Sequence, residues 1–367
     1  MSLMSWPLSV PVLTDGFVTL RAHHSNDLEP MVEMVTDPQT QSWTSVPAEY
    51  HEQAAEQFMS EVVSAGWDSG SHRIWVVELD GAFVGQVDLR GAGPVKEIAY
   101  VTHPFFRERG ATRAAVRLVL NYAFTELATD VVHWRARVGN VASLKVAQAC
   151  GFTFHETIPR LLHENGQLHD AWTGSIAFGE PTFPSKEWPN ITLAGERVRL
   201  RPLRQRDGER WDETLGEAAA QTYLVGTIGA FTEGSSAERF AGVQWDTARG
   251  RSFAFVITDR DSDEFCGLVI AHGLTAANGG GTELEWMLHP DARGRGLMTE
   301  AVTLVLGYVL DPGGFDQRRV TAFVASSNGA SNHVAQRAGG RLFGTQTSSE
   351  PIGDGDYDDL NEYEWLR

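Results

Sequence analysis

Residues 289–296 form the part of this chain best suited to binding an anion; they read His289-Pro290-Asp291-Ala292-Arg293-Gly294-Arg295-Gly296. A strand-like run over 283–289 leads into them, and a helix-like run over 297–310 follows. Glycine lets backbone N–H groups face a ligand without a side chain in the way, and a helix N-terminus adds free N–H groups and positive dipole charge. We therefore expect this junction to bind a phosphate. Its spacing matches neither a P-loop nor Gly-x-Gly-x-x-Gly.

The same stretch occurs earlier in the chain, so the sequence contains an internal repeat. When the chain is shifted by 186 positions, 97–124 aligns with 283–310 without a gap, and 12 of the 28 positions are identical. The junction residues correspond in pairs, Arg107 with Arg293, Arg109 with Arg295 and Gly110 with Gly296. This identity indicates a tandem duplication.

Composition indicates an ordinary globular protein. The 367 residues are 42% hydrophobic and 21% charged, enough for two domains that each have a core. The net charge of −18 argues against a nucleic-acid partner and suits an amine-bearing one. Only Cys150 and Cys266 are cysteines, which excludes a disulfide framework and a cysteine metal cluster. Residues 1–13 lack a basic signal-peptide region and no run reaches the ~20 apolar residues of a membrane span, so we expect a cytoplasmic protein without a membrane partner.

The elements that position the junctions follow the same order in each half. The alternation and turn signals predict β-α-α-β-β-β-α-β-α-β-β, an α/β fold of the α+β type in which helices pack on a mixed sheet. In the second half, the pattern predicts one helix over 206–220 and another over 236–249. We expect domains at 1–179 and 193–367, joined by a Pro-rich linker at 180–192.

On these residues, the chain resembles the GCN5-related N-acetyltransferase (GNAT) superfamily and, within it, the ribosomal-protein N-terminal acetyltransferases of the Rim type. The family signature Arg/Gln-x-x-Gly-x-Gly/Ala is matched by Arg107-x-x-Gly110-x-Thr112 and by Arg293-x-x-Gly296-x-Met298. The last position departs from the pattern in both copies, and a bulkier side chain there should crowd the phosphate. A second signature is matched by Asn140-x-x-Ser143 with Gly151-Phe152 and by Asn328-x-x-Ser331 with Gly339-Gly340.

The resemblance covers both halves and implies two tandem acyl-CoA N-acyltransferase domains that use acetyl-CoA and no metal. It implies a coenzyme arm lying between a splayed fourth and fifth strand, where it pairs like an added strand. It also implies the coenzyme-binding residues, namely Arg107, Arg109, Gly110, Ala111, Thr112 and Asn140 in the first half and Arg293, Gly294, Arg295, Gly296, Leu297, Met298 and Asn328 in the second.

Acetyl transfer to an amine needs a base for the ammonium group and an acid for the leaving thiolate. Candidate bases are Glu97 in the first half and Glu283 and Glu285 in the second, and the alternative is that they are solvated carboxylates at the strand edge. The tyrosine that often serves as the family's acid is replaced by Ala147 and Ala335. Ser143 and Ser331 can take its place, or they can simply cap their helices.

The sequence thus predicts an acetyl-CoA-dependent N-acetyltransferase in which a primary amine attacks the thioester directly. The acceptor is either a protein N-terminus or a small-molecule amine. We expect both halves to bind coenzyme and to pack as an intramolecular pseudo-dimer. In the alternative, one or both halves are non-catalytic acyl-CoA-binding or scaffolding domains.

Overall fold

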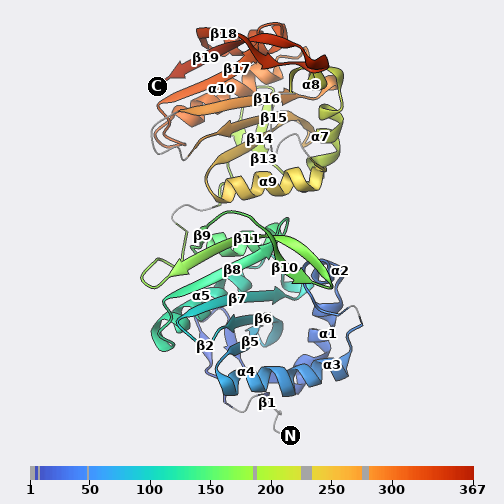
Figure 1. Ribbon diagram of the computed structural model, residues 1–367, viewed down its shortest axis with the longest axis vertical. Helices are drawn as coiled ribbons and strands as arrows, with labels where there is room; N and C mark the ends of the chain where they lie inside the picture. Colours follow the sequence, from blue (N-terminus) through green and yellow to red (C-terminus); the bar gives the residue numbers. More distant parts are fainter. Residues whose placement is uncertain (1–4, 7–8, 48, 185–187, 225–233, 275–280) are drawn as a thin grey trace. The chain divides into compact units, whose positions relative to one another are not determined.

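The computed structural model describes residues 5–6, 9–47, 49–184, 188–224, 234–274 and 281–367 (Figure 1). The chain divides into two compact units, Met1–Trp188 and Pro189–Arg367. This boundary lies within the predicted linker, part of which falls outside the described residues. None of the described helices is long and apolar enough to cross a membrane.

The first unit is a mixed sheet covered by helices. Its described elements are β1 (Ser5–Trp6), β2 (Leu13–Thr14), β3 (Thr19–Arg21), β4 (His23–His24), α1 (Leu28–Thr36), α2 (Pro38–Trp43), α3 (Glu52–Gln57), a π-helical segment (Phe58–Val63), α4 (Ser64–Ser69), β5 (His72–Leu79), β6 (Ala82–Arg90), β7 (Val95–Thr102), α5 (Ala111–Glu126), β8 (Val131–Arg137), α6 (Val141–Ala149), β9 (Thr153–Phe154), β10 (Ile158–Glu164) and β11 (Gln167–Ala177). The main sheet has the order β10-β11-β8-β7-β6-β5-β3-β2, with β9 also paired to β11. Only β7 and β8 are parallel; the other neighbours are antiparallel.

The second unit repeats this arrangement. Its described elements are β12 (Leu193–Ala194), β13 (Val198–Pro202), α7 (Gly208–Leu215), α8 (Ala218–Tyr223), α9 (Ser236–Ala248), β14 (Ser252–Asp259), β15 (Phe265–His272), β16 (Thr282–Leu288), α10 (Leu297–Leu310), β17 (Arg319–Ala325), α11 (Gly329–Arg337), β18 (Arg341–Pro351) and β19 (Tyr357–Leu366). The sheet order is β12-β13-β14-β15-β16-β17-β19-β18, and β16–β17 is the parallel pair. The predicted fold class of two mixed-sheet domains is confirmed.

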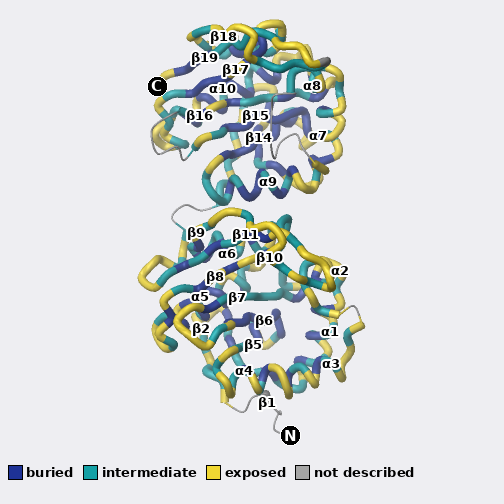
Figure 2. The backbone as a smooth tube through the Cα atoms, viewed as in Figure 1, coloured by how far each residue is buried: buried dark blue, intermediate teal, exposed yellow. Residues whose placement is uncertain are grey.

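Apolar side chains fill both faces of the second sheet. All residues of β14 and β15 except the last are buried, which Figure 2 shows as dark blue strands. On one face, Phe255 and Val269 pack in the same cluster as α10 residues such as Val302. On the other face, Val256 and Leu268 pack with α7 and α9. Strands covered on both faces read as continuous apolar runs, so these strands are recognisable from sequence.

The helix predicted over 206–220 is wrong in one respect, because it is broken in two. Helix α7 ends at Leu215, and α8 begins after Glu217, whose carboxylate accepts a hydrogen bond from the backbone N–H of Ala219 at 2.9 Å. A side-chain cap of this kind starts a new helix where the apolar pattern alone suggests a continuous one.

Candidate functional site

The parallel strands at the centre of the second sheet separate after two residue pairs. Strands β16 and β17 pair at Thr282–Val320 and Glu283–Thr321, and then diverge. A cavity of about 1120 Å³ lies against this opening, and its lining includes most of β16, residues 293–294 and 296–299, and the first turn of α11. This volume exceeds the ~300–1,000 Å³ of typical small-molecule sites.

The predicted anion junction forms one side of this cavity. Gly294 and Gly296 adopt left-handed conformations, with φ of 74° and 73°, which glycine tolerates best. Gly296 is the N-cap of α10, so the first turn of that helix offers its free N–H groups at this point. The side chains of Leu297 and Met298 are almost fully buried. Met298, expected to crowd a phosphate, therefore lies largely in the core, although it also borders the cavity.

The two arginines of the junction are held by carboxylates. Arg293 donates to Glu217 at 2.8 Å, and Arg295 donates to Asp259. These hydrogen bonds lower the pKa of both carboxyl groups. The arginines thus brace the loop against α8 and the end of β14.

Four ionisable side chains line another part of the cavity. On β15, His272 Nε2 lies 3.2 Å from Glu285 Oε2 on β16. Burial raises the pKa of Glu283, and the charge of Glu285 adds to this while His272 opposes it. Burial and the charges of Asp358 and Glu283 likewise raise the pKa of Glu350 on β18. This concentration of carboxylates suits an ammonium group.

Asn328 and Ser331 adjoin the same cavity at the start of α11. Asn328 Oδ1 accepts a hydrogen bond of 3.1 Å from the backbone N–H of Ser331, so the capping role is present in the structure. Both residues also line the cavity. Among the described residues, no hydrogen bond joins Ser331 to Trp286, which is one of the β16 residues that line the cavity with it.

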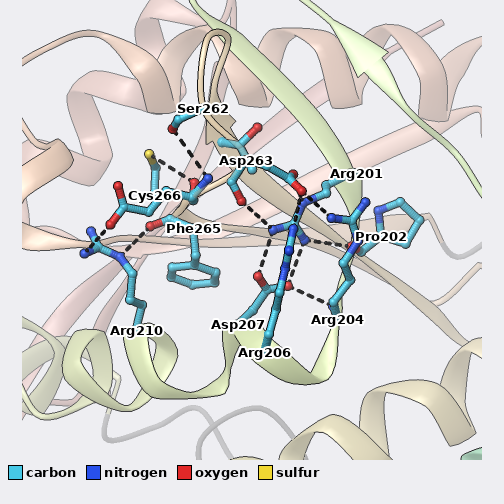
Figure 3. A network of polar contacts seen from close by, with 12 residues as sticks. Arg201, Pro202, Arg204, Arg206, Asp207, Arg210, Ser262, Asp263, Phe265 and Cys266 are labelled. Atoms are coloured by element: carbon cyan, nitrogen blue, oxygen red, sulfur yellow. Dashed lines mark hydrogen bonds and ion pairs between the residues drawn. The ribbon is translucent and has the colours of Figure 1, made fainter.

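A buried arginine fixes the start of α7, which contributes Thr214 to the cavity wall. Arg201 donates to both oxygens of Asp207 at 2.8 Å and to Asp263 at 2.6 Å (Figure 3). In the next turn, Arg210 donates to the backbone oxygen of Phe265 (Figure 3). Arg210 also donates to Asp291, so α7 holds the beginning of the anion junction as well.

The corresponding loop of the first unit carries a carboxylate. Glu108 stands where the second unit has Gly294, and it adopts a left-handed conformation with φ of 63°. Gly110 caps α5 with φ of 80°, and Ala111 and Thr112 begin that helix. Nearby, Arg107 donates to Asp37 at 2.5 Å. The exposed charge of Glu108 opposes anion binding.

Side chains also bridge the strand opening of the first unit. Tyr100, at the position of Trp286, donates its hydroxyl to the backbone oxygen of Ser143 at 2.9 Å, and the Ser143 hydroxyl donates back at 3.1 Å. Trp134 Nε1 donates to the Ser143 hydroxyl at 3.0 Å. Burial raises the pKa of Tyr100. Asn140 caps α6 as Asn328 caps α11. Strand β7 is therefore tied to α6 across the opening.

The cross-strand neighbours explain this difference between the units. Trp134 on β8 is paired with Gly174 on β11, whereas the corresponding Ala322 on β17 is paired with Tyr363 on β19. The large side chain thus moves one strand away from the opening in the second unit. There, Tyr363 donates to Asn332 Oδ1 of α11 at 2.9 Å.

The predicted base of the first unit is engaged in ion pairs. Glu97 Oε2 lies 2.9 Å from Arg135, and Oε1 lies 3.7 Å from Arg90. The second unit has Phe323 and His272 at the positions of these arginines, and Glu285 at the position of Ala99. Arg109, the last of the predicted coenzyme residues, lies 5.1 Å over the ring of Phe106.

The family model of the acetyltransferase (GNAT) domain matches residues 18–153 and again 197–341. The chain belongs to the GNAT acetyltransferase family. Both matches contain an anion junction and an Asn-x-x-Ser turn, so the tandem GNAT duplication inferred from the repeat is confirmed.

Individual GNAT proteins match only part of this chain and share limited sequence identity with it. The chain is 34% identical over 94 residues to the putative ribosomal N-acetyltransferase YdaF of Bacillus subtilis, which is 25% of this chain and about half, 51%, of that relative. RimJ of Mycobacterium smegmatis, solved with a CoA-disulfide, is 23% identical, with 47% of this chain and 88% of that chain covered and a TM-score of 0.42. A putative ribosomal-protein-serine acetyltransferase from Vibrio cholerae is 17% identical, with 47% and 99% covered and a TM-score of 0.41.

Three residues that shape these GNAT sites were not predicted, namely His272, Glu350 and Tyr100. Each lies on a strand, and its importance comes from a neighbour on another element. The position of His272 opposite Glu283 on the paired strands β15 and β16 could have indicated its role. The sequence does not show this pairing, because the length of the intervening loop does not fix the register. Among the described residues, no group of three or more His, Cys, Asp or Glu side chains is arranged to hold a metal ion.

Proposed function

We propose that this chain is an acetyl-CoA-dependent N-acetyltransferase whose working site lies in the second unit. One observation carries the proposal: a single cavity adjoins the glycine-rich junction and also the carboxylates of Glu283 and Glu285. An anion-binding loop and a proton-accepting group in one cavity are what transfer from an anionic coenzyme to an amine requires.

The residues of the second unit fit the coenzyme. A backbone loop with two left-handed glycines at a helix N-terminus suits a pyrophosphate, and the unpaired edge of β16 beyond Glu283 suits an extended amide arm. Bound acetyl-CoA would supply the thioester carbonyl that the amine attacks. Gly294, Gly296 and the first turn of α10 would hold the phosphates, and Ser331 and Asn328 would border the arm.

The acceptor in this proposal is a primary amine that arrives as an ammonium ion. The cluster of Glu283, Glu285 and Glu350 supports a cationic acceptor. The likeness to a putative ribosomal N-acetyltransferase supports a protein N-terminus. A small-molecule amine meets the same charge requirement.

In the first unit, we propose a GNAT domain that does not load coenzyme. Glu108 places negative charge in the anion loop, and the Tyr100–Ser143 and Trp134–Ser143 hydrogen bonds span the place where the arm would enter. This differs from the sequence-based expectation that both halves bind. It supports a scaffolding role for the first unit alone.

Calorimetric titration of the full chain with acetyl-CoA tests both parts of the proposal. We expect one site per chain. Gly296→Asp should abolish binding, because a carboxylate in the cradle repels the pyrophosphate and its Cβ would lie 2.9 Å from Arg197 Nη1. The matched variant Gly110→Asp should leave the stoichiometry unchanged. Two sites would refute the inactive first unit, and no site would refute the enzyme.

A further inference from the structure

Glu285 lies in the cavity with one oxygen held and the other unbound. Oε2 lies 3.2 Å from His272 Nε2, whereas Oε1 is enclosed and has no hydrogen-bond partner within the described part of the chain. An enclosed carboxylate oxygen without a donor is costly unless a ligand supplies one. An ammonium group is such a donor.

We propose that His272 is a positioning residue that holds Glu285 as the proton acceptor for the amine. This inference rests on the proposed function and adds to it the residue that selects Glu285 over Glu283. The imidazole N–H donates to Oε2, which fixes the carboxylate and leaves Oε1 to face the acceptor.

Charged groups of both signs border the cavity with His272, because Arg293 and His333 line it together with the carboxylates. Glu283 and Glu285 face it from β16, Glu350 borders the same cavity from β18, and Tyr223 does so from α8. Ser252 is its neighbour on β14. A neutral histidine can donate to a carboxylate without permanently neutralising it, whereas an arginine carries a permanent charge.

The first unit provides an internal comparison. At the position of His272 it has Arg90, and at the position of Glu285 it has Ala99. Arg90 lies 3.7 Å from Glu97 and 2.7 Å from Asp88. The unit whose strand opening is bridged by Tyr100 and Trp134 also lacks this histidine–carboxylate pair.

The reaction at this site transfers one acetyl group and moves two protons off the nitrogen. The ammonium group gives one proton to Glu285 Oε1, and the neutral amine attacks the thioester carbon, forming a C–N bond. The tetrahedral oxyanion then collapses, the C–S bond breaks, and the sulfur leaves with the electron pair. The second nitrogen proton passes to the thiolate, and Glu285 releases its proton to solvent. The products are an amide and a thiol.

The pH dependence of kcat/KM distinguishes positioning from a purely structural role. The probes are putrescine and a short peptide with a free N-terminal serine, each with acetyl-CoA, and the profile uses the better probe. His272→Leu removes the hydrogen-bond donor to the Glu285 carboxylate, so the acidic limb of the profile should move to higher pH. We also expect kcat to fall about tenfold. His272→Gln, which keeps an N–H donor, should restore most of the wild-type profile.

Two controls make the result decisive. Glu285→Gln should lower kcat by roughly 10²–10⁴ while acetyl-CoA still binds, and Arg90→Gln in the first unit should leave the profile unchanged. A His272→Leu profile that superimposes on an active wild type would overturn the role of His272 alone. Failure of the wild type to acetylate either probe would overturn the proposed function and this inference with it.

Discussion

His23 is a fully buried histidine that the first unit keeps neutral. The Gln86 amide lies 2.8 Å from its Nε2, and Nδ1 has no partner within the described residues. Burial, opposed by Asp27, lowers its pKa from 6.5 to about 4. A lowered folded-state pKa means that the unfolded chain binds the proton first, so stability is complete above pH 6.5 and is lost as the pH falls toward 4.

This predicts an acid sensitivity that belongs to a single side chain. The shift from 6.5 to about 4 corresponds to roughly 3 kcal/mol between pH 7 and pH 4. His23→Leu should remove that part of the acid destabilisation, whatever its effect at pH 7. Amide hydrogen exchange of β5 and β6, measured at pH 7, 5.5 and 4, reports opening of this unit. Equal acid loss in wild type and variant would contradict the assignment.

Residue types and spacing were enough to predict the anion loop but not the side chains that decide whether it works. Arg107 and Arg293 occupy equivalent positions in the motif and were both expected to bind coenzyme. In the structure, each donates to a carboxylate at the start of a helix. Glu108 was visible in the sequence as a departure from Gly294. Its meaning depends on the left-handed backbone at that position, which a motif does not specify.

At the scale of elements, the ion pair of Arg201 and Asp207 fixes where α7 begins. Both side chains are almost fully buried, with 2% and 3% of their surface exposed. Asp207→Ala would leave Asp263 as the carboxylate partner of a buried guanidinium, and losing one partner of a buried pair typically costs about 3–5 kcal/mol. We expect a loss of this size in the unfolding free energy of the second unit, measured by urea denaturation followed with hydrogen exchange.

The duplication supplies the control for that measurement. Arg21 and Asp27 form the same pair in the first unit, at 2.7 Å. Asp27→Ala should destabilise the first unit and leave exchange in β14 and β15 unchanged. If either variant increased hydrogen exchange equally in both units, the stabilising effect of each ion pair would not be confined to its own unit.

Element order was predictable because helices and strands differ in apolar period, and because the repeat reads the same pattern twice. The register of the paired strands could not be predicted in this way. His272 and Arg90 occupy equivalent positions only when β15 is paired with β16 and β6 with β7. The same holds for Trp134 opposite Gly174 and Ala322 opposite Tyr363, where the large side chain lies on different strands in the two units. Such pairs join residues that are distant in sequence, so periodicity does not reveal them.

At the scale of the whole molecule, the two units have separate cores and unequal sites. The core clusters identified in the described residues each lie within one unit. A ligand that binds one folded unit stabilises that unit by RT ln(1 + [L]/Kd), which is about 2.7 kcal/mol at a hundredfold excess over Kd. Scanning calorimetry should therefore show two transitions, of which acetyl-CoA raises only one.

Variants identify the transition that moves. In Gly296→Asp, the shift should disappear, whereas Glu108→Lys in the first unit should leave it intact. Asp27→Ala should lower the midpoint of the other transition, because its pair lies in the unit that we propose does not load coenzyme. If acetyl-CoA raised both transitions, and Gly296→Asp removed only one of the two shifts, both cradles would be functional. The hydrogen bonds from Tyr100 and Trp134 to Ser143 would then have to open when coenzyme enters.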